Sequence, residues 1–360
     1  MRGTMTWVGM DVHARSTHAA AVAAATGELC RVRFGAGAEP VVAWLRGLPA
    51  PVRACYEAGP TGYGLARAAR LAGIGVDVIA PSKTPRAPGE RIKTDRRDAE
   101  LLVRLLMAGQ LRPVAIPTPR IEGLRDLTRA RDRIRADLLR ARHRVSKLLL
   151  RYGRVWPSDR GTWTQEHRHW LVRQRFDDPN LALAYLDALA AVDALLRRRD
   201  VLDQRLLLAA QDADVATAVA RLRAFRGINT LTAIGLHAEI HDWQRFDRPG
   251  RLAAWIGLVP SLYQSGESAT SGAITKSGSR HARRLLVEAA WHYQRRPGRG
   301  ADLQRRQEGV DQRIIDISWR CQHRLFRVHT HLRDRGKPAN IATVAAAREL
   351  TCFLWAAMRE

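Results

Sequence analysis

Short apolar runs separated by turn residues dominate the start of the chain and constrain its fold more than any other feature. The runs at residues 6–12, 18–25, 29–34, 52–57 and 76–80 have the composition of β-strands. Between these strands, residues 40–48 and 61–72 predict two short helices. A third predicted helix begins at Thr94 and runs to about residue 107. Segment 81–92 is rich in Pro, Gly and Arg and predicts a loop. Strands that alternate with helices in this way predict an α/β layer domain.

The remainder of the chain has a helical pattern. Residues 121–152 carry apolar side chains at helical spacing, and residues 181–210 form a second long segment rich in Leu and Ala. Together they predict a coiled-coil arm, with an irregular region and a short helix at 153–180. A Ser- and Gly-rich loop at 260–278 precedes predicted helices at 279–295, 310–335 and 341–358. We therefore predict three regions: an α/β domain at 1–115, a basic helical connector at 116–211 and a mainly helical domain at 212–360.

The charge of the chain indicates a polyanionic partner. Lys and Arg number 60 against 35 Asp and Glu, which leaves a formal net charge of +25. Biased codon usage would explain a preference for Arg over Lys, but not why acidic residues fail to balance the Arg. The excess is spread along the whole chain, which suits a long nucleic acid that touches several regions.

Cysteines and apolar segments exclude several other classes of protein. The four cysteines lie far apart with no C-x-x-C pair, so neither a zinc finger nor a disulfide scaffold is expected. The N-terminus lacks the pattern of a signal peptide, and no stretch reaches the roughly 20 apolar residues of a membrane span. We expect a cytoplasmic protein, associated with the bacterial nucleoid, that does not contact a membrane.

The first long helix carries many arginines on its surface. Within residues 124–151 the basic residues are offset by Asp126, Asp132 and Asp137 only. A solvated helix face is the common reason for such a pattern, but the imbalance favours a helix that faces nucleic acid or pairs with another helix. The residues selected for nucleic-acid contact on this helix are Arg129, Arg133, Arg140 and Arg144.

Four carboxylates occupy positions that can converge. Asp11 lies late on the first predicted strand, Glu57 ends a later strand, and Asp95 and Asp98 begin a helix. Strand ends and helix starts can meet at one edge of an α/β sheet, where gathered carboxylates need cations between them. Each residue also has an ordinary explanation, since acids favour helix starts and turns. An Asp inside an apolar strand is harder to explain without a partner, so spacing alone leaves a metal site and a structural role about equally supported.

Three N-terminal motifs and a second block downstream resemble one family. The N-terminal motifs are residues 8–13 (VGMDVH), 55–62 (CYEAGPTG) and 93–99 (KTDRRDA). The downstream block comprises residues 222–229 (LRAFRGIN), 255–260 (WIGLVP), 264–266 (QSG), 276–280 (KSGSR) and 283–286 (RRLL). Together they resemble the DEDD-type insertion-sequence transposases of the insertion-sequence "one-ten" family, relatives of the Piv DNA invertases. The resemblance covers nearly the whole chain in order, and only residues 153–210 carry no motif.

The resemblance implies a fold and a mechanism. The N-terminal domain would be ribonuclease-H-like, similar to the RuvC-type junction resolvases, and Asp11, Glu57, Asp95 and Asp98 would bind Mg²⁺, as two ions. The C-terminal transposase domain would supply a serine nucleophile that forms a transient phosphoserine link to DNA. The matching residue is Ser265, chosen for its distance from Lys276. Other serines of the same loop stay open as candidates, and they are Ser261, Ser268, Ser271, Ser277 and Ser279.

The resemblance also implies partners. These are donor and target DNA, a guide RNA encoded by the element, and further copies of the chain, as a dimer that becomes a tetramer when active. Ser265 would then reach the acidic site of another subunit. Basic residues of the downstream block are expected to contact nucleic acid, and they are Lys276, Arg280, Arg283 and Arg284.

Two alternatives to a transposase or site-specific recombinase remain open at this point. A structure-specific nuclease of the resolvase type would use the carboxylates with water as the nucleophile and would not need Ser265. A transposase-derived protein that only binds nucleic acid would tolerate the loss of Asp11.

Overall fold

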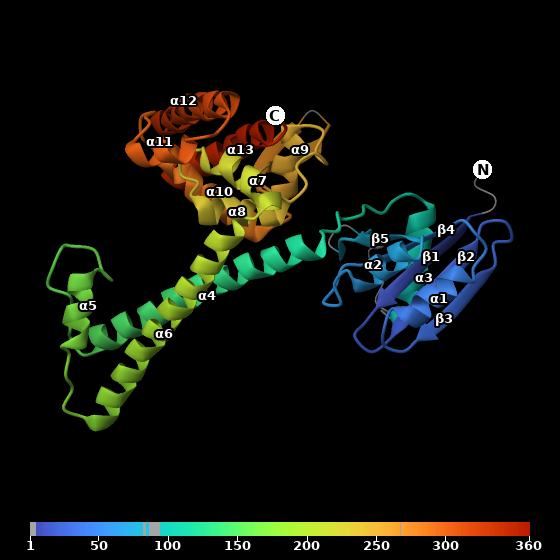
Figure 1. The fold of residues 1–360 in the computed structure, drawn as a ribbon, viewed down its shortest axis with the longest axis horizontal. Helices are drawn as coiled ribbons and strands as arrows, with labels where there is room; N and C mark the ends of the chain where they lie inside the picture. Colours follow the sequence, from blue (N-terminus) through green and yellow to red (C-terminus); the bar gives the residue numbers. More distant parts are fainter. Residues whose placement is uncertain (1–4, 82–83, 86–93, 267) are drawn as a thin grey trace. The chain divides into compact units, whose positions relative to one another are not determined.

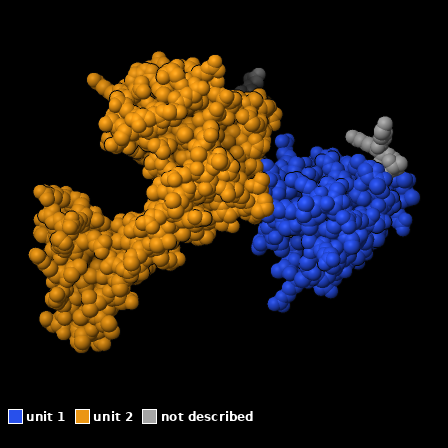
Figure 2. Space-filling model, in the orientation of Figure 1, with its two compact units in different colours: residues 1–117 blue, residues 118–360 orange. Residues whose placement is uncertain are grey.

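The computed structural model describes residues 5–81, 84–85, 94–266 and 268–360. Most of the predicted loop 81–92, and Lys93, lie outside these residues. The chain divides into two compact units, residues 1–117 and residues 118–360 (Figure 2). The finer division into 1–115, 116–211 and 212–360 stays a prediction.

Unit 1 is built on a five-stranded mixed sheet with the order β3-β2-β1-β4-β5 (Figure 1). Strands β1 (Thr6–Val12), β2 (Thr17–Ala23) and β3 (Leu29–Phe34) form an antiparallel meander. Strands β4 (Val52–Glu57) and β5 (Gly75–Ile79) continue the sheet in parallel with β1. The mixed α/β domain predicted from the apolar runs is therefore confirmed.

Helices cover both faces of this sheet. Helices α1 (Glu39–Arg46) and α2 (Gly64–Leu71) share one hydrophobic cluster with Val8 and Met10 of β1. Helix α3 (Asp95–Met107) packs against β1 and β2 through the opposite face. Gly9 makes this close approach possible, because a Cβ at this position would lie 2.3 Å from the carbonyl oxygen of Ala99.

A helical arm begins unit 2. Helices α4 (Pro119–Arg151) and α6 (Pro179–Ala209) pack along each other (Figure 1). Their distal parts enclose a hydrophobic cluster that includes Val145, Leu149, Tyr185 and the short helix α5 (Gln165–Val172). Among the described residues, α6 is long and apolar enough to cross a membrane by length and composition alone, so the prediction that no segment reaches that length is wrong for this helix.

The rest of unit 2 packs around one large core. Its helices are α7 (Ala213–Arg223), α8 (Thr230–Ile240), α9 (Pro249–Ile256), α10 (Arg280–Ala290), α11 (Ala301–Gln307), α12 (Gln312–Asp334) and α13 (Ala339–Ala357). The three predicted C-terminal helices correspond to α10, α12 and α13, whereas α9 and α11 were not predicted.

The prediction of an irregular loop at 260–278 is wrong. Strands β6 (Pro260–Ser265) and β7 (Ser268–Ile274) form an antiparallel hairpin over most of that segment. Its Ser, Gly and Ala residues lack the apolar alternation that marks a strand, because most of the hairpin is exposed instead of lying on a core.

Candidate functional site

Asp11 and Glu57 lie side by side on neighbouring strands. Met10 of β1 is in register with Tyr56 of β4, so the parallel pairing brings the next residues, Asp11 and Glu57, to the same level. Met10 and Tyr56 face the core beneath α1 and α2. Because side chains alternate along a strand, Asp11 and Glu57 both lie on the face covered by α3.

The start of α3 brings further carboxylates to this edge. The Thr94 side chain accepts a hydrogen bond from the backbone N–H of Arg97 and caps the helix, which places Asp95 and Asp98 in its first turn. Burial raises the pKa of Asp11, the neighbouring His13 lowers it, and the charges of Asp95 and Asp98 raise it again. These acids are therefore close enough to influence one another.

His13 joins the acidic residues. Its Nε2 atom lies 3.2 Å from Asp11 Oδ2 and 3.6 Å from Asp95 Oδ1, while His18 Nε2 lies 3.6 Å from Asp95 Oδ2. In the part of the chain that the structure describes, Asp11, His13 and Asp95 form a group able to hold a metal ion, with one ligand atom each within 4.8 Å of the others. The predicted ligands Glu57 and Asp98 lie outside this group.

The sequence analysis did not select either histidine. His13 stands two residues after Asp11 in the first motif, just past the end of β1, and that short spacing was the available signal. His18 lies on β2 opposite Asp11, a register that the sequence does not reveal.

Ser265 ends the exposed strand β6 at the tip of the hairpin. It pairs with Ser268 across a turn in which Gly266 has a left-handed φ of 57°. Three of the alternative serines make hydrogen bonds within unit 2, because the hydroxyls of Ser261, Ser277 and Ser279 donate to acceptors in that unit. Ser265 itself is exposed.

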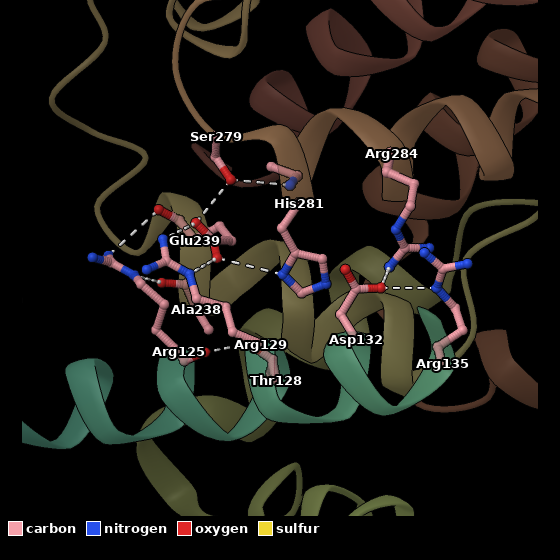
Figure 3. Close-up of polar contacts among 11 residues, drawn as sticks. Arg125, Thr128, Arg129, Asp132, Arg135, Ala238, Glu239, Ser279, His281 and Arg284 are labelled. Atoms are coloured by element: carbon pink, nitrogen blue, oxygen red, sulfur yellow. Dashed lines mark hydrogen bonds and ion pairs between the residues drawn. The ribbon is translucent and has the colours of Figure 1, made fainter. Parts of the chain in front are cut away.

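A buried carboxylate in unit 2 holds three elements together (Figure 3). Glu239 of α8 accepts two hydrogen bonds from the Arg129 guanidinium of α4, at 2.7 and 3.0 Å. The Ser279 hydroxyl donates to the same carboxylate at 2.9 Å, and His281 Nδ1 lies 3.4 Å from it. Burial would raise the pKa of Glu239, but the hydrogen bonds from His281, Arg129 and Ser279 and the charge of Arg129 outweigh burial and hold this pKa at about 2. Sequence reasoning missed this network.

Basic residues of α10 that were selected for nucleic-acid contact have partners inside unit 2. Arg284 pairs with Asp132 at 2.7 Å, as Figure 3 shows, and Arg283 donates to the backbone oxygens of Ile256 and Ser277. These contacts tie the start of α10 to α4 and to the base of the hairpin. Arg280 and Lys276 are exposed.

Basic residues further along α4 are more accessible. Arg133, Arg140 and Arg144 are exposed, and Arg140 pairs with Asp137 at the surface. Helical spacing puts the three guanidiniums on one side of α4 together with Lys147. This side of the helix forms a mainly basic face, in which Asp137 pairs with Arg140.

An α/β unit with acids at one sheet edge, joined to a basic helical unit, is the arrangement expected of an enzyme that processes nucleic acid. Residues 8–153 match a family model described as "Transposase", that of the DEDD type of IS110, and residues 219–304 match the "Transposase IS116/IS110/IS902 family". The "Putative transposase y4qE" of Sinorhizobium fredii is 38% identical over 98% of this chain and 88% of its own length. The "Transposase for insertion sequence element IS1533" of Leptospira borgpetersenii is 31% identical over 79% of this chain and 83% of its own length.

The chain belongs to the IS110/IS116/IS902 family of DEDD transposases. It is therefore a DNA-cutting and DNA-joining enzyme of an insertion sequence. Transposases of this family usually use a divalent metal, and the Asp11, His13 and Asp95 group is a possible acidic metal site.

Proposed function

We propose that this transposase cuts DNA at the edge of the unit 1 sheet, in a ribonuclease-H-like domain of the RuvC type. The observation that carries the proposal is the convergence of Asp11 and Glu57, side by side on parallel strands, with the first turn of α3. This arrangement supports a role for Asp11, Glu57, Asp95 and Asp98 as the ligands of Mg²⁺, in a site for two ions.

The donor set fits a divalent cation. Carboxylate oxygens suit Mg²⁺, and the imidazole of His13 adds a donor that Mn²⁺ accepts as well. Cations bound there would neutralise the carboxylates and the charge that develops on the transferred phosphate. The carboxylates would hold the ions, and His13, within hydrogen-bond distance of Asp11, would orient that carboxylate.

We propose Ser265 as the nucleophile. Its Oγ would form a bond to a DNA phosphorus while the bond from phosphorus to the leaving sugar oxygen breaks, which yields a phosphoserine link that a second strand later resolves. The exposed hairpin tip supports this role because a long DNA strand can approach it. Unit 1 holds the acids and unit 2 holds Ser265, so we propose that the two act together in a homo-oligomer, a dimer that becomes a tetramer when active.

Donor DNA, target DNA and a guide RNA encoded by the element are the proposed partners, in a reaction on the chromosome in the cytoplasm. The basic face of α4, with Arg133, Arg140 and Arg144, supports contact with nucleic-acid backbone. Lys276 and Arg280 supply exposed charge after the hairpin, whereas Arg129, Arg283 and Arg284 have internal partners and are proposed to shape the binding surface instead of contacting phosphate directly.

A cleavage assay with Mg²⁺, donor DNA and the flanking RNA of the element tests the proposal. Asp11→Asn should abolish cleavage and leave DNA binding intact, while Glu39→Gln, at an exposed acid of unit 1, should have no effect. Ser265→Ala should remove the covalent protein–DNA adduct, while Ser268→Ala, at its partner position in the hairpin, should retain it. Cleavage without an adduct and unaffected by Ser265→Ala would mean that water attacks, as in a resolvase-type nuclease.

A further inference from the structure

A cavity of about 620 Å³ lies in unit 1 beside the acidic edge. It is bounded by the end of β1, by residues 37–38 before α1, and by the segment from the end of β4 to the start of α2. After β1 the chain turns to β2 on one side of the sheet, and after β4 it continues through α2 to β5 on the other side. Crevices between strands whose connections diverge in this way commonly bind ligands in α/β proteins.

The cavity and the acidic site occupy opposite faces of the same sheet edge. Val12 and Tyr56 line the cavity, and they alternate along their strands with Asp11 and Glu57. His13 is common to both places, because it lines the cavity and lies 3.2 Å from Asp11. A molecule that reaches around the sheet edge at His13 would therefore contact both.

The walls of the cavity suit a mainly apolar molecule with polar edges. Side chains such as Val12, Ala38 and Leu65 provide apolar walls. Thr61 lines the cavity, and its Oγ1 atom makes no hydrogen bond within the described residues, so rotation of the side chain can turn the hydroxyl toward an edge of the ligand. Lining glycines such as Gly62 and Gly64 keep the cavity open.

We propose that this cavity holds an unstacked nucleobase of the DNA strand whose phosphate lies at the acidic edge. The inference rests on the proposed function, because that function puts a DNA phosphate beside His13. The sugar and base of the adjoining nucleotide are then the groups within reach of the cavity. A base buries its faces against apolar walls and pairs its edge with groups such as Thr61, which is how enzymes commonly hold an extruded base.

Filling the cavity tests the proposal. Gly64→Leu adds a side chain at a lining position where a Cβ meets nothing within 4 Å and where φ is not left-handed, so unit 1 should fold normally. Gly35→Leu is the matched control, since its Cβ also meets nothing within 4 Å but Gly35 does not line the cavity. Both variants are made in the full-length chain and checked by circular dichroism.

Single-turnover cleavage is then compared on intact DNA and on DNA with an abasic nucleotide on either side of the cut. With wild type and Gly35→Leu, the abasic nucleotide on one side should slow cleavage about tenfold, as expected when one base loses its contacts. Gly64→Leu should slow cleavage of intact DNA by a similar factor, and the abasic nucleotide should then have no further effect. Effects that multiply, or the absence of either effect, would overturn the proposal.

Two further comparisons distinguish a failure of this inference from a failure of the proposed function. If abasic positions in the flanking RNA, and not in the DNA, lose their effect in Gly64→Leu, the cavity holds an RNA base and the proposal is wrong. The comparison depends on cleavage rates and not on which group attacks. A failure of the Asp11→Asn or Ser265→Ala tests would therefore overturn the proposed chemistry while the Gly64 comparison still gave its own answer.

Discussion

The buried carboxylate of Glu239 should contribute strongly to the stability of unit 2. The Glu239 side chain is 2% exposed and joins Arg129 of α4, Ser279 before α10 and His281 within α10. Glu239→Gln keeps the shape of the side chain but removes the charge that Arg129 needs. We expect this change to weaken the contacts of α8, which carries Glu239, with α4 and α10.

The pKa of Glu239 gives the size of the effect. Its value falls from 4.5 to about 2 on folding, which corresponds to about 3 kcal/mol of stability at neutral pH. Breaking a buried ion pair by removing one partner costs a similar amount, about 3–5 kcal/mol. Urea unfolding of the full-length protein, followed by far-UV circular dichroism of its helices, measures the loss.

The pH dependence of this loss has a defined sign. Because the folded pKa of Glu239 lies below its unfolded value, the stabilisation is fully present above pH 4.5 and disappears as the pH falls toward 2. The difference between wild type and Glu239→Gln should therefore shrink in that window. Asp137→Asn, which breaks the exposed pair with Arg140, should cost about 1 kcal/mol or less. A loss below about 1 kcal/mol for Glu239→Gln at neutral pH would refute the reasoning.

Two further predictions concern unit 1 and the arm. Gly9→Ala should destabilise unit 1 by about 2 kcal/mol or more, because its Cβ would lie 2.3 Å from the oxygen of Ala99; thermal unfolding measures this, and a wild-type melting curve would contradict it. Replacing Arg133 and Arg144 with Gln should reduce the slope of log affinity against log salt by about two in a nucleic-acid binding titration. The control Arg324→Gln, which removes a guanidinium paired with a carboxylate, should leave that slope unchanged, and equal slopes for all variants would make the basic face structural.

The sequence allowed prediction of those helices and strands whose apolar residues recur at regular spacing. The strands of unit 1 alternate with recognisable turns, and the arm helices repeat apolar residues at helical spacing, so both were found. Asp11 was recognised because a charge inside an apolar strand needs a partner. Its neighbours His13 and His18 were missed because strand register decides which side chains meet.

The interior of unit 2 was harder to predict. Glu239 is one acid at the end of an otherwise apolar helix, a position typical of solvent exposure, and only the packing of α4 against α8 buries it. The arginines of α4 and α10 look alike in the sequence. Only the folded structure distinguishes them. Arg129 and Arg284 have buried or half-buried partners, whereas Arg133 and Arg144 are exposed.

Helix α4 links the arm to the large core of unit 2. Its 33 residues give a length of about 50 Å, and beyond Gly123 they include neither Gly nor Pro. Leu124 of this helix belongs to the large core of unit 2, whereas Leu138 and Val145 belong to the cluster of the arm. One uninterrupted helix therefore connects two separate hydrophobic clusters, and the contact of Arg129 with Glu239 fixes it to α8 at the end nearer the large core.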